Sequence, residues 1–223
     1  MEIVASRCKA PAQRATSAAG QRRGRLIGYV HGHDIAPTAP KRVYQLLIEL
    51  DEVEPRVWRR LWVPDTLTLA KLDRVIQAAM GWTNSHLHEF EVDGKRYGIP
   101  DDEGICESLT LDDRRHKVGA VLGASVSGFR YVYDFGDNWR HTVTIEDRLL
   151  PDESFNTWTV CIAGQNACPP EDVGGVGGYA EFLEAISDPS HDEHAAMWQW
   201  SGGPFDPTGF DVNATNAALR SLR

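Results

Sequence analysis

Few cysteines occur in the sequence, and none has the spacing of a zinc ribbon or a redox dithiol. Cys8, Cys106, Cys161 and Cys168 lie at irregular intervals, and no Cys-x-x-Cys motif is present. This spacing excludes those two classes of site and favours reduced thiols. Cys161 and Cys168 are left with three interpretations: packed side chains, a bridged pair, or two ligands of one metal.

Long apolar runs are also missing. No segment approaches the roughly 20 consecutive apolar residues that span a bilayer, and the N-terminus lacks an apolar stretch followed by a small-residue cleavage site. We therefore expect no membrane association and a cytoplasmic location. With 223 residues, 42% of them hydrophobic, the chain is long enough to bury one substantial core.

Positive charge is scarce outside the N-terminus. Residues 1–42 carry eight Lys or Arg against Glu2 and Asp34, which gives this segment a net charge of +6. Since the net charge of the whole chain is −9, the remainder carries −15. No Lys or Arg occurs between Leu149 and Arg220. An acidic body repels phosphate backbones, so nucleic-acid binding is disfavoured there and DNA association is expected only through the basic tail. Residues 1–42, poor in large apolar side chains, are predicted to form a disordered tail, and 43–223 a single domain.

Hydrophobic patterning predicts strands first and helices last. Thr68 and Gly81 have the residue types that begin and end a helix, and Ser190 with Glu193 has the spacing of a capping box. The predicted strands cover 43–50, 56–63, 85–92, 95–99, 129–135 and 139–145, and the predicted helices 68–81, 179–187, 190–200 and 211–222. This order indicates an α+β fold of antiparallel hairpins, with one helix after the second strand and a helical C-terminal quarter.

Histidines and one aspartate suggest a metal site. His86 and His88 are two residues apart in a predicted strand, so their side chains would lie on one face, roughly 7 Å apart. Asp137 and His141 are four apart on a second hairpin. If the two hairpins face each other, the four side chains could hold zinc or another divalent ion. The alternative is that the histidines are half-buried and hydrogen-bonded for structural reasons.

A second set of residues suggests a ligand-binding cleft. Its members come from the aromatic and acidic hairpin around residue 135 and from the loop at residues 168–172, and they are Asp134, Asp137, Trp139, Cys168, Glu171 and Asp172. Serine nucleophile elbows, His-Glu-x-x-His and the zinc deaminase signature are absent. The residues therefore predict a polar cleft without naming a reaction.

Several co-linear motifs resemble the plasmid pRiA open-reading-frame-three-like family. They are Arg56-Val57-Trp58-Arg59-Arg60, Gly81-Trp82 with His86-Leu87-His88-Glu89-Phe90, the segment 131–141, the segment 168–175, and Phe205-Asp206-Pro207. The resemblance spans about residues 44–219 and implies an α+β domain found on plasmids and mobile elements, with a resolvase-like label but no activity to carry over. Neither a serine nor a tyrosine recombinase arrangement is present.

Three functional hypotheses follow. The first is an accessory binding protein of mobile-element type, whose His/Asp-lined cleft takes a small ligand, a metal or a partner protein. The second is a metal-assisted hydrolase with His86, His88 and His141 as ligands and Asp137 or Glu171 as general base. The third is DNA association through the basic tail.

Overall fold

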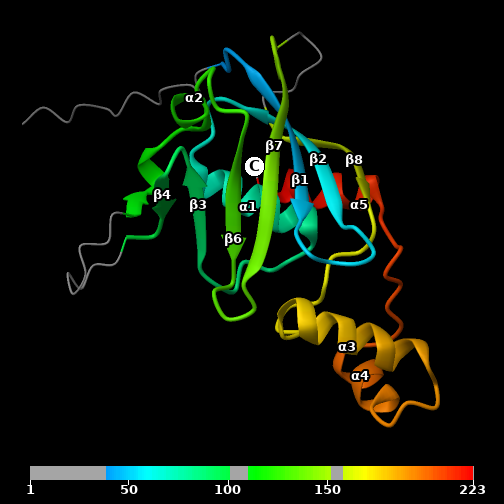
Figure 1. Ribbon diagram of the computed structural model, residues 1–223. Helices are drawn as coiled ribbons and strands as arrows, with labels where there is room; N and C mark the ends of the chain where they lie inside the picture. The colour runs from blue at the N-terminus through cyan, green and yellow to red at the C-terminus, as the bar shows by residue number, and fades with distance from the viewer. Residues whose placement is uncertain (1–38, 101–109, 152–157, 223) are drawn as a thin grey trace, which may run out of the picture. The chain divides into compact units, whose positions relative to one another are not determined.

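The computed structural model describes residues 39–100, 110–151 and 158–222. The first 38 residues of the predicted basic tail, with Cys8, and Cys106 further on, lie outside this part of the chain. Eight strands form one sheet in the order β5-β4-β3-β6-β7-β1-β2-β8 (Figure 1). The strands are β1 (Val43–Leu50), β2 (Trp58–Pro64), β3 (His88–Val92), β4 (Lys95–Gly98), β5 (Thr110–Asp112), β6 (Gly128–Tyr133), β7 (Trp139–Leu149) and β8 (Val160–Gln165).

The predicted α+β class is confirmed. Neighbouring strands pair antiparallel except β4 and β5, which run parallel. No helix within the described residues is long and apolar enough to cross a membrane. The helices are α1 (Leu69–Met80), the short η1 (Asp113–Arg115), α2 (Val118–Val121), α3 (Gly175–Ser187), α4 (His194–Trp200) and α5 (Val212–Ser221).

The β1-β2-α1 opening follows from local sequence signals. β1 has the predicted bounds, and β2 begins two residues later than predicted, at Trp58. The Thr68 side chain accepts a hydrogen bond from the Lys71 amide at 3.3 Å, and Gly81 adopts φ 102°. A hydroxyl cap at the start and a left-handed glycine at the end satisfy backbone groups that the helix leaves unpaired. Both predicted ends of α1 are therefore confirmed.

One face of the sheet carries the core. Along β1 the alternate residues Tyr44, Leu46 and Ile48 are buried, as the period of two requires. α1 and α5 lie against this face and contact each other, and α5 also contacts β8 (Figure 1). The opposite face is richer in exposed and charged side chains, including Arg130 and Arg140.

A buried arginine ties the sheet to the helices. Arg59 is only 3% exposed and donates hydrogen bonds to the carbonyl oxygens of Ala79, Gln165 and Asn166. Its guanidinium lies 4.4 Å from the centre of the Phe210 ring. Burial lowers the pKa of Arg59. The guanidinium meets carbonyl dipoles and a ring face, so this cation joins the end of α1 to the end of β8, and no carboxylate of the described residues pairs with it.

Strand β8 was not predicted from the sequence. It pairs with β2 on one side, and on the other the side chain of Asn216 in α5 bonds to the backbone of Cys161. The amide oxygen of Asn216 accepts from the Cys161 amide at 2.9 Å, and its nitrogen donates to the Cys161 carbonyl at 2.8 Å. One side chain thus satisfies both backbone groups of an edge residue.

The C-terminal helices differ from the prediction at their starts. α3 begins at Gly175, inside the glycine-rich run, and not at Tyr179. The capping-box prediction at Ser190 is wrong, because the backbone amide and hydroxyl of Ser190 both bond to the Asp188 carboxylate, and α4 starts at His194. The sequence allows Asp211 or Asn213 as the cap of α5, and the cap is Asp211, whose side chain accepts hydrogen bonds from the amides of Asn213 and Ala214.

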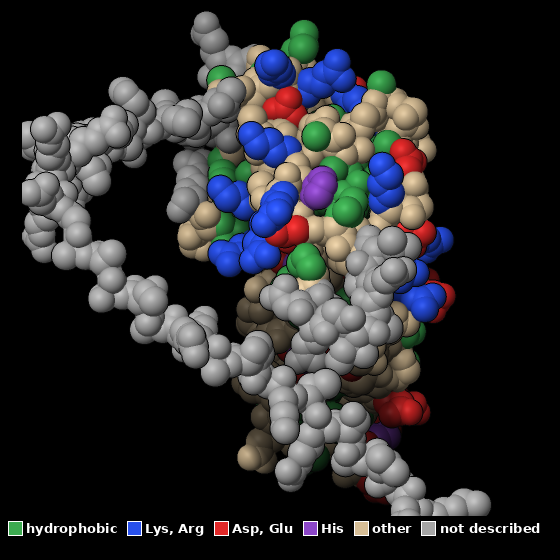
Figure 2. Space-filling model, turned by 90° about the vertical axis from the view of Figure 1, so that its left-hand side faces the viewer, with side chains coloured by type: hydrophobic (Ala, Val, Ile, Leu, Met, Phe, Trp, Pro, Cys, Tyr) green, Lys and Arg blue, Asp and Glu red, His purple; other side chains and the backbone are tan. Residues whose placement is uncertain are grey.

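Lysine and arginine side chains gather on the side of the molecule that carries β4 and α2 (Figure 2). The exposed basic residues of this region include Arg96, Arg115 and Lys117. The stretch between Leu149 and Arg220, which contains α3 and α4, has none. Within the described residues, α3 and α4 therefore carry no Lys or Arg of their own.

Two adjacent glycines of α3 provide a test of its backbone packing. A Cβ atom on Gly178 would lie 2.0 Å from the carbonyl oxygen of Val173, whereas one on Gly177 would meet nothing within 4 Å. We expect Gly178→Ala to lower the free energy of unfolding by about 1 to 3 kcal/mol. Gly177→Ala should raise it by up to about 1 kcal/mol, because alanine favours helix. Urea unfolding of both variants measures the difference, and equal effects would contradict the packing described.

Candidate functional site

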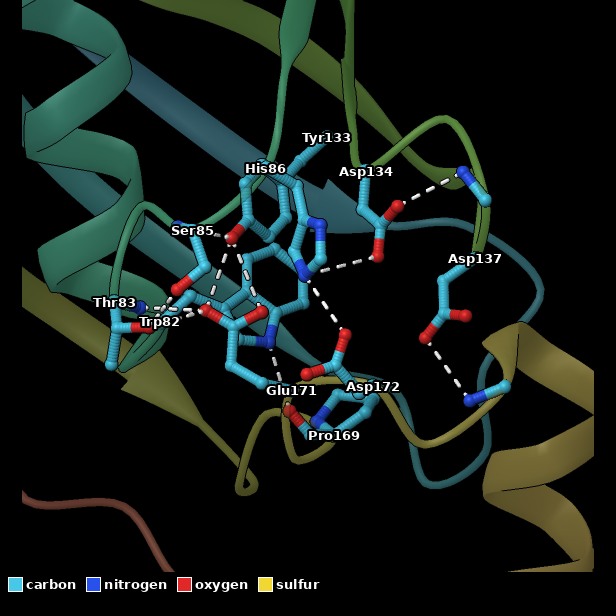
Figure 3. A network of polar contacts seen from close by, with 12 residues as sticks. Trp82, Thr83, Ser85, His86, Tyr133, Asp134, Asp137, Pro169, Glu171 and Asp172 are labelled. Atoms are coloured by element: carbon cyan, nitrogen blue, oxygen red, sulfur yellow. Dashed lines mark hydrogen bonds and ion pairs between the residues drawn. The ribbon is translucent and has the colours of Figure 1, made fainter.

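One imidazole and two carboxylates converge from three distant segments. His86 precedes β3, Asp134 follows β6, and Asp172 lies in the loop before α3 (Figure 3). The Nε2 atom of His86 is 2.9 Å from Oδ1 of Asp172 and 3.6 Å from Oδ2 of Asp134. Each residue offers one possible ligand atom, and these three atoms lie within 4.8 Å of one another. We call these three residues the His/Asp cluster.

Both carboxylates of the cluster are carried on unusual backbone. Asp134 has φ 53° and Asp172 has φ 57°, in the left-handed region that non-glycine residues seldom adopt. The Oδ1 atom of Asp134 accepts a hydrogen bond from the Gly136 amide at 2.9 Å, which fixes the turn and leaves Oδ2 directed at His86. The Asp134 side chain is 10% exposed and that of Asp172 69%. The cluster therefore has one enclosed carboxylate and one that solvent reaches.

Glu171 anchors the loop that carries Asp172. Its carboxylate accepts hydrogen bonds from the amide and hydroxyl of Thr83, at 2.7 and 3.1 Å, and from the hydroxyl of Tyr133, at 3.0 Å (Figure 3). Next to it, the indole of Trp82 donates to the carbonyl of Pro169 at 2.9 Å. Burial and the bond to Glu171 raise the pKa of Tyr133. The Tyr133 hydroxyl also lies 3.1 Å from the second oxygen, so Glu171 positions the loop and both of its oxygens have hydrogen-bond partners.

Asp137 has a similar structural contact. Its Oδ2 atom accepts a hydrogen bond from the backbone amide of Gly174 at 3.0 Å (Figure 3). Gly175 packs against the same turn, since a Cβ there would lie 2.5 Å from the Asp137 carbonyl. Asp137 thus joins the β6-β7 turn to the residues that precede α3.

His88 points away from the cluster and into the core. β3 begins at His88 and not at the predicted residue 85. His88, Phe90 and Val92 share its buried face, while His86, which was expected in the same strand, lies before it. The ring nitrogens of His88 lie 3.3 Å from Asp73 and 2.8 Å from Asp113. Burial raises the pKa of Asp73, and the neighbouring His88 opposes this shift. His88 therefore joins α1 to η1 inside the protein.

His141 and Trp139 are core residues of β7. Both are at most 1% exposed, and the Nδ1 atom of His141 is 3.3 Å from the Tyr131 carbonyl. Within the described residues, neither Nε2 of His141 nor the indole nitrogen of Trp139 has a hydrogen-bond partner. Cys168 is partly buried, and burial raises the pKa of its thiol, which disfavours the thiolate that metal ligation requires.

The structure therefore divides the predicted residues. Of the four predicted metal ligands, His86 alone belongs to the His/Asp cluster, while His88, Asp137 and His141 contact other groups. The other members, Asp134 and Asp172, came from the predicted ligand-binding set. Whether any of these residues binds a metal or ligand stays a prediction.

His141 should make stability depend on pH. Burial lowers its pKa from 6.5 to about 4, so below pH 6.5 the unfolded chain takes up a proton that the folded chain refuses. As the pH falls from about 6.5 to about 4, His141 therefore removes about 3 kcal/mol of folding free energy. Replacing it with glutamine should flatten the pH dependence of unfolding across this range. Urea titrations at each pH measure this, with His191→Gln as control, and an unchanged slope in His141→Gln would contradict the assignment.

Comparison with known proteins gives one consistent result. Residues 42–214 match the family described as Plasmid pRiA4b ORF-3-like protein. The chain is 42% identical over 182 residues to the uncharacterised protein y4hQ of Sinorhizobium fredii (strain NBRC 101917 / NGR234), covering 81% of this chain and 92% of that protein. The crystal structure of MM3350, a protein of unknown function from Methanosarcina mazei Go1, matches with a TM-score of 0.71 and 35% identity, covering 78% of this chain and 97% of the other.

The matched segment contains the sheet, the His/Asp cluster and the loop that Glu171 anchors. It excludes the basic residues 1–41, to which the family therefore gives no function. On its sequence motifs, its fold and these matches, the chain belongs to the plasmid pRiA4b ORF-3-like family.

Proposed function

We propose that this chain is an accessory binding protein whose His/Asp cluster, His86, Asp134 and Asp172, holds a divalent cation. The observation that carries the proposal is the approach of two carboxylate oxygens to one imidazole nitrogen, at 2.9 and 3.6 Å. Such a mixture of nitrogen and oxygen donors suits zinc and other divalent first-row metals. Three side chains leave further coordination positions for water or for a ligand.

Backbone conformation supports the same proposal. Asp134 and Asp172 both adopt positive φ, and so do Asn84 and Asn138 close by in the chain. Conformations of this kind cost free energy and concentrate at functional sites. The surrounding hydrogen bonds of Glu171 and Asp137 hold the two loops against this cost. A cation would offset the repulsion between the two carboxylates.

The geometry favours binding over the hydrolase hypothesis. That hypothesis requires His86, His88 and His141 around one metal, yet His88 lies between two buried aspartates and His141 is fully buried. Its proposed base, Glu171, already accepts three hydrogen bonds. We also propose that the protein is associated with mobile elements and is located in the cytoplasm. The description of the family as plasmid-encoded supports the association with mobile elements.

Zinc binding tests the proposal directly. We expect one zinc ion per chain by isothermal titration calorimetry. His86→Ala should weaken zinc binding at least tenfold, because it removes the nitrogen donor common to both contacts. Asp172→Asn should weaken it as well, and asparagine tolerates the left-handed backbone at that position.

Asp137→Asn is the matched control. Like Asp172→Asn, it removes one negative charge, but from a neighbouring loop. The asparagine keeps an oxygen that can accept the hydrogen bond from the Gly174 amide. Zinc affinity should stay within about threefold in this variant. Sub-stoichiometric binding by the native chain, or an equal loss in Asp137→Asn and His86→Ala, would rule out the His/Asp cluster as the metal site.

A further inference from the structure

A cavity of about 240 Å³ lies between α3, α4 and the loop before α3. Its apolar lining includes Phe182, Met197 and Trp200, and its carboxylates are those of Asp172, Glu181 and Glu193. Ligand pockets for drug-sized molecules occupy roughly 300 to 1,000 Å³. The volume therefore suits one small amine or a single side chain better than a nucleotide or a large cofactor.

Two of the three carboxylates of this cavity, those of Glu181 and Glu193, have no cationic partner among the described residues. In the described part of the chain, the side chains of Glu181 and Glu193 have no hydrogen bond or ion pair. No Lys or Arg occurs between Leu149 and Arg220, so the surrounding segment offers no ammonium or guanidinium group of its own. Like charges around one hollow raise the local concentration of a cation.

The aromatic lining complements this charge. The rings of Phe182 and Trp200 meet edge to face with centroids 5.8 Å apart. Phe182 is buried, whereas Trp200 is 48% exposed. An indole face attracts guanidinium and ammonium groups, and the thioether of Met197 adapts to an aliphatic stem. The cavity can therefore hold a charged group against the Trp200 ring and a methylene chain against the Met197 side chain.

We infer that this cavity binds a guanidinium or ammonium group carried on a short aliphatic stem. The occupant is either a free alkyl cation or the side chain of an arginine or lysine in a polypeptide. This inference goes beyond cation binding at the His/Asp cluster and uses separate residues, except that Asp172 lines both sites. None of the variants that test the cavity alters the shared Asp172, so the two sites can be tested separately.

A pair of isosteric probes isolates the role of charge. With metal-free full-length protein, n-butylguanidine should shift the indole N–H resonance of Trp200, identified from the spectrum of Trp200→Leu. The neutral isostere n-butylurea should bind at least tenfold more weakly. Equal binding of the two probes, or a shift that spares Trp200, would overturn the inference.

Matched substitutions separate the cavity from general acidity. The double variant Glu181→Gln with Glu193→Gln should bind n-butylguanidine about tenfold more weakly, since each partly exposed ion pair contributes a factor of up to about five. Glu184→Gln, in the same helix but outside this cavity, should change binding less than twofold. Trp200→Leu should weaken binding, whereas Trp198→Leu should not. Loss of binding in the control variants would overturn the site.

Two further arms identify the source of the cation and keep the two sites distinct. A pentapeptide with one central arginine between glycines, compared with its citrulline counterpart, tests a polypeptide source. Tighter binding of the arginine peptide than of n-butylguanidine indicates a protein partner, and the reverse indicates a small molecule. His86→Ala should retain n-butylguanidine binding while losing zinc, so either proposal can fail alone. Loss of n-butylguanidine binding in His86→Ala would overturn the cavity as a separate site.

Discussion

The carboxylate of Glu171 is the contact on which the candidate site depends. By accepting hydrogen bonds from Thr83 and Tyr133, it fixes the loop before α3 to the end of α1 and to β6. The next residue, Asp172, is thereby held beside His86. Removal of this anchor would free the loop, and with it both the exposed carboxylate of the His/Asp cluster and the rim of the α3-α4 cavity.

The sequence predicted the fold best where local signals and burial agree. β1 and α1 were located closely because an apolar strand, a hydroxyl cap and a C-terminal glycine occur within one short stretch. β8 was missed because its pairing partner β2 is about a hundred residues away, so nothing local marks it. The start of α4 was misplaced because Ser190 bonds to Asp188, a local alternative that competes with the capping box.

The candidate site shows the same division. All three residues of the His/Asp cluster were among the predicted candidates, but they were assigned to two different sets. Grouping His86 with His88 assumed a strand that includes both, whereas β3 begins only at His88. Two residues of separation imply a shared face only inside regular strand. His86 and His88 have different surroundings because β3 starts between them, and no residue type near His88 indicates where the strand starts.

The pairing of Asn216 with Cys161 also governs how the molecule meets copies of itself. An unpaired strand margin is a template on which another polypeptide can add and extend the ladder. Here the side-chain amide of Asn216 in α5 makes the two hydrogen bonds to Cys161 that a residue of an added strand would make. Intermolecular sheet extension at Cys161 would first have to displace Asn216, so the packing of the last helix opposes the addition of a strand at this edge.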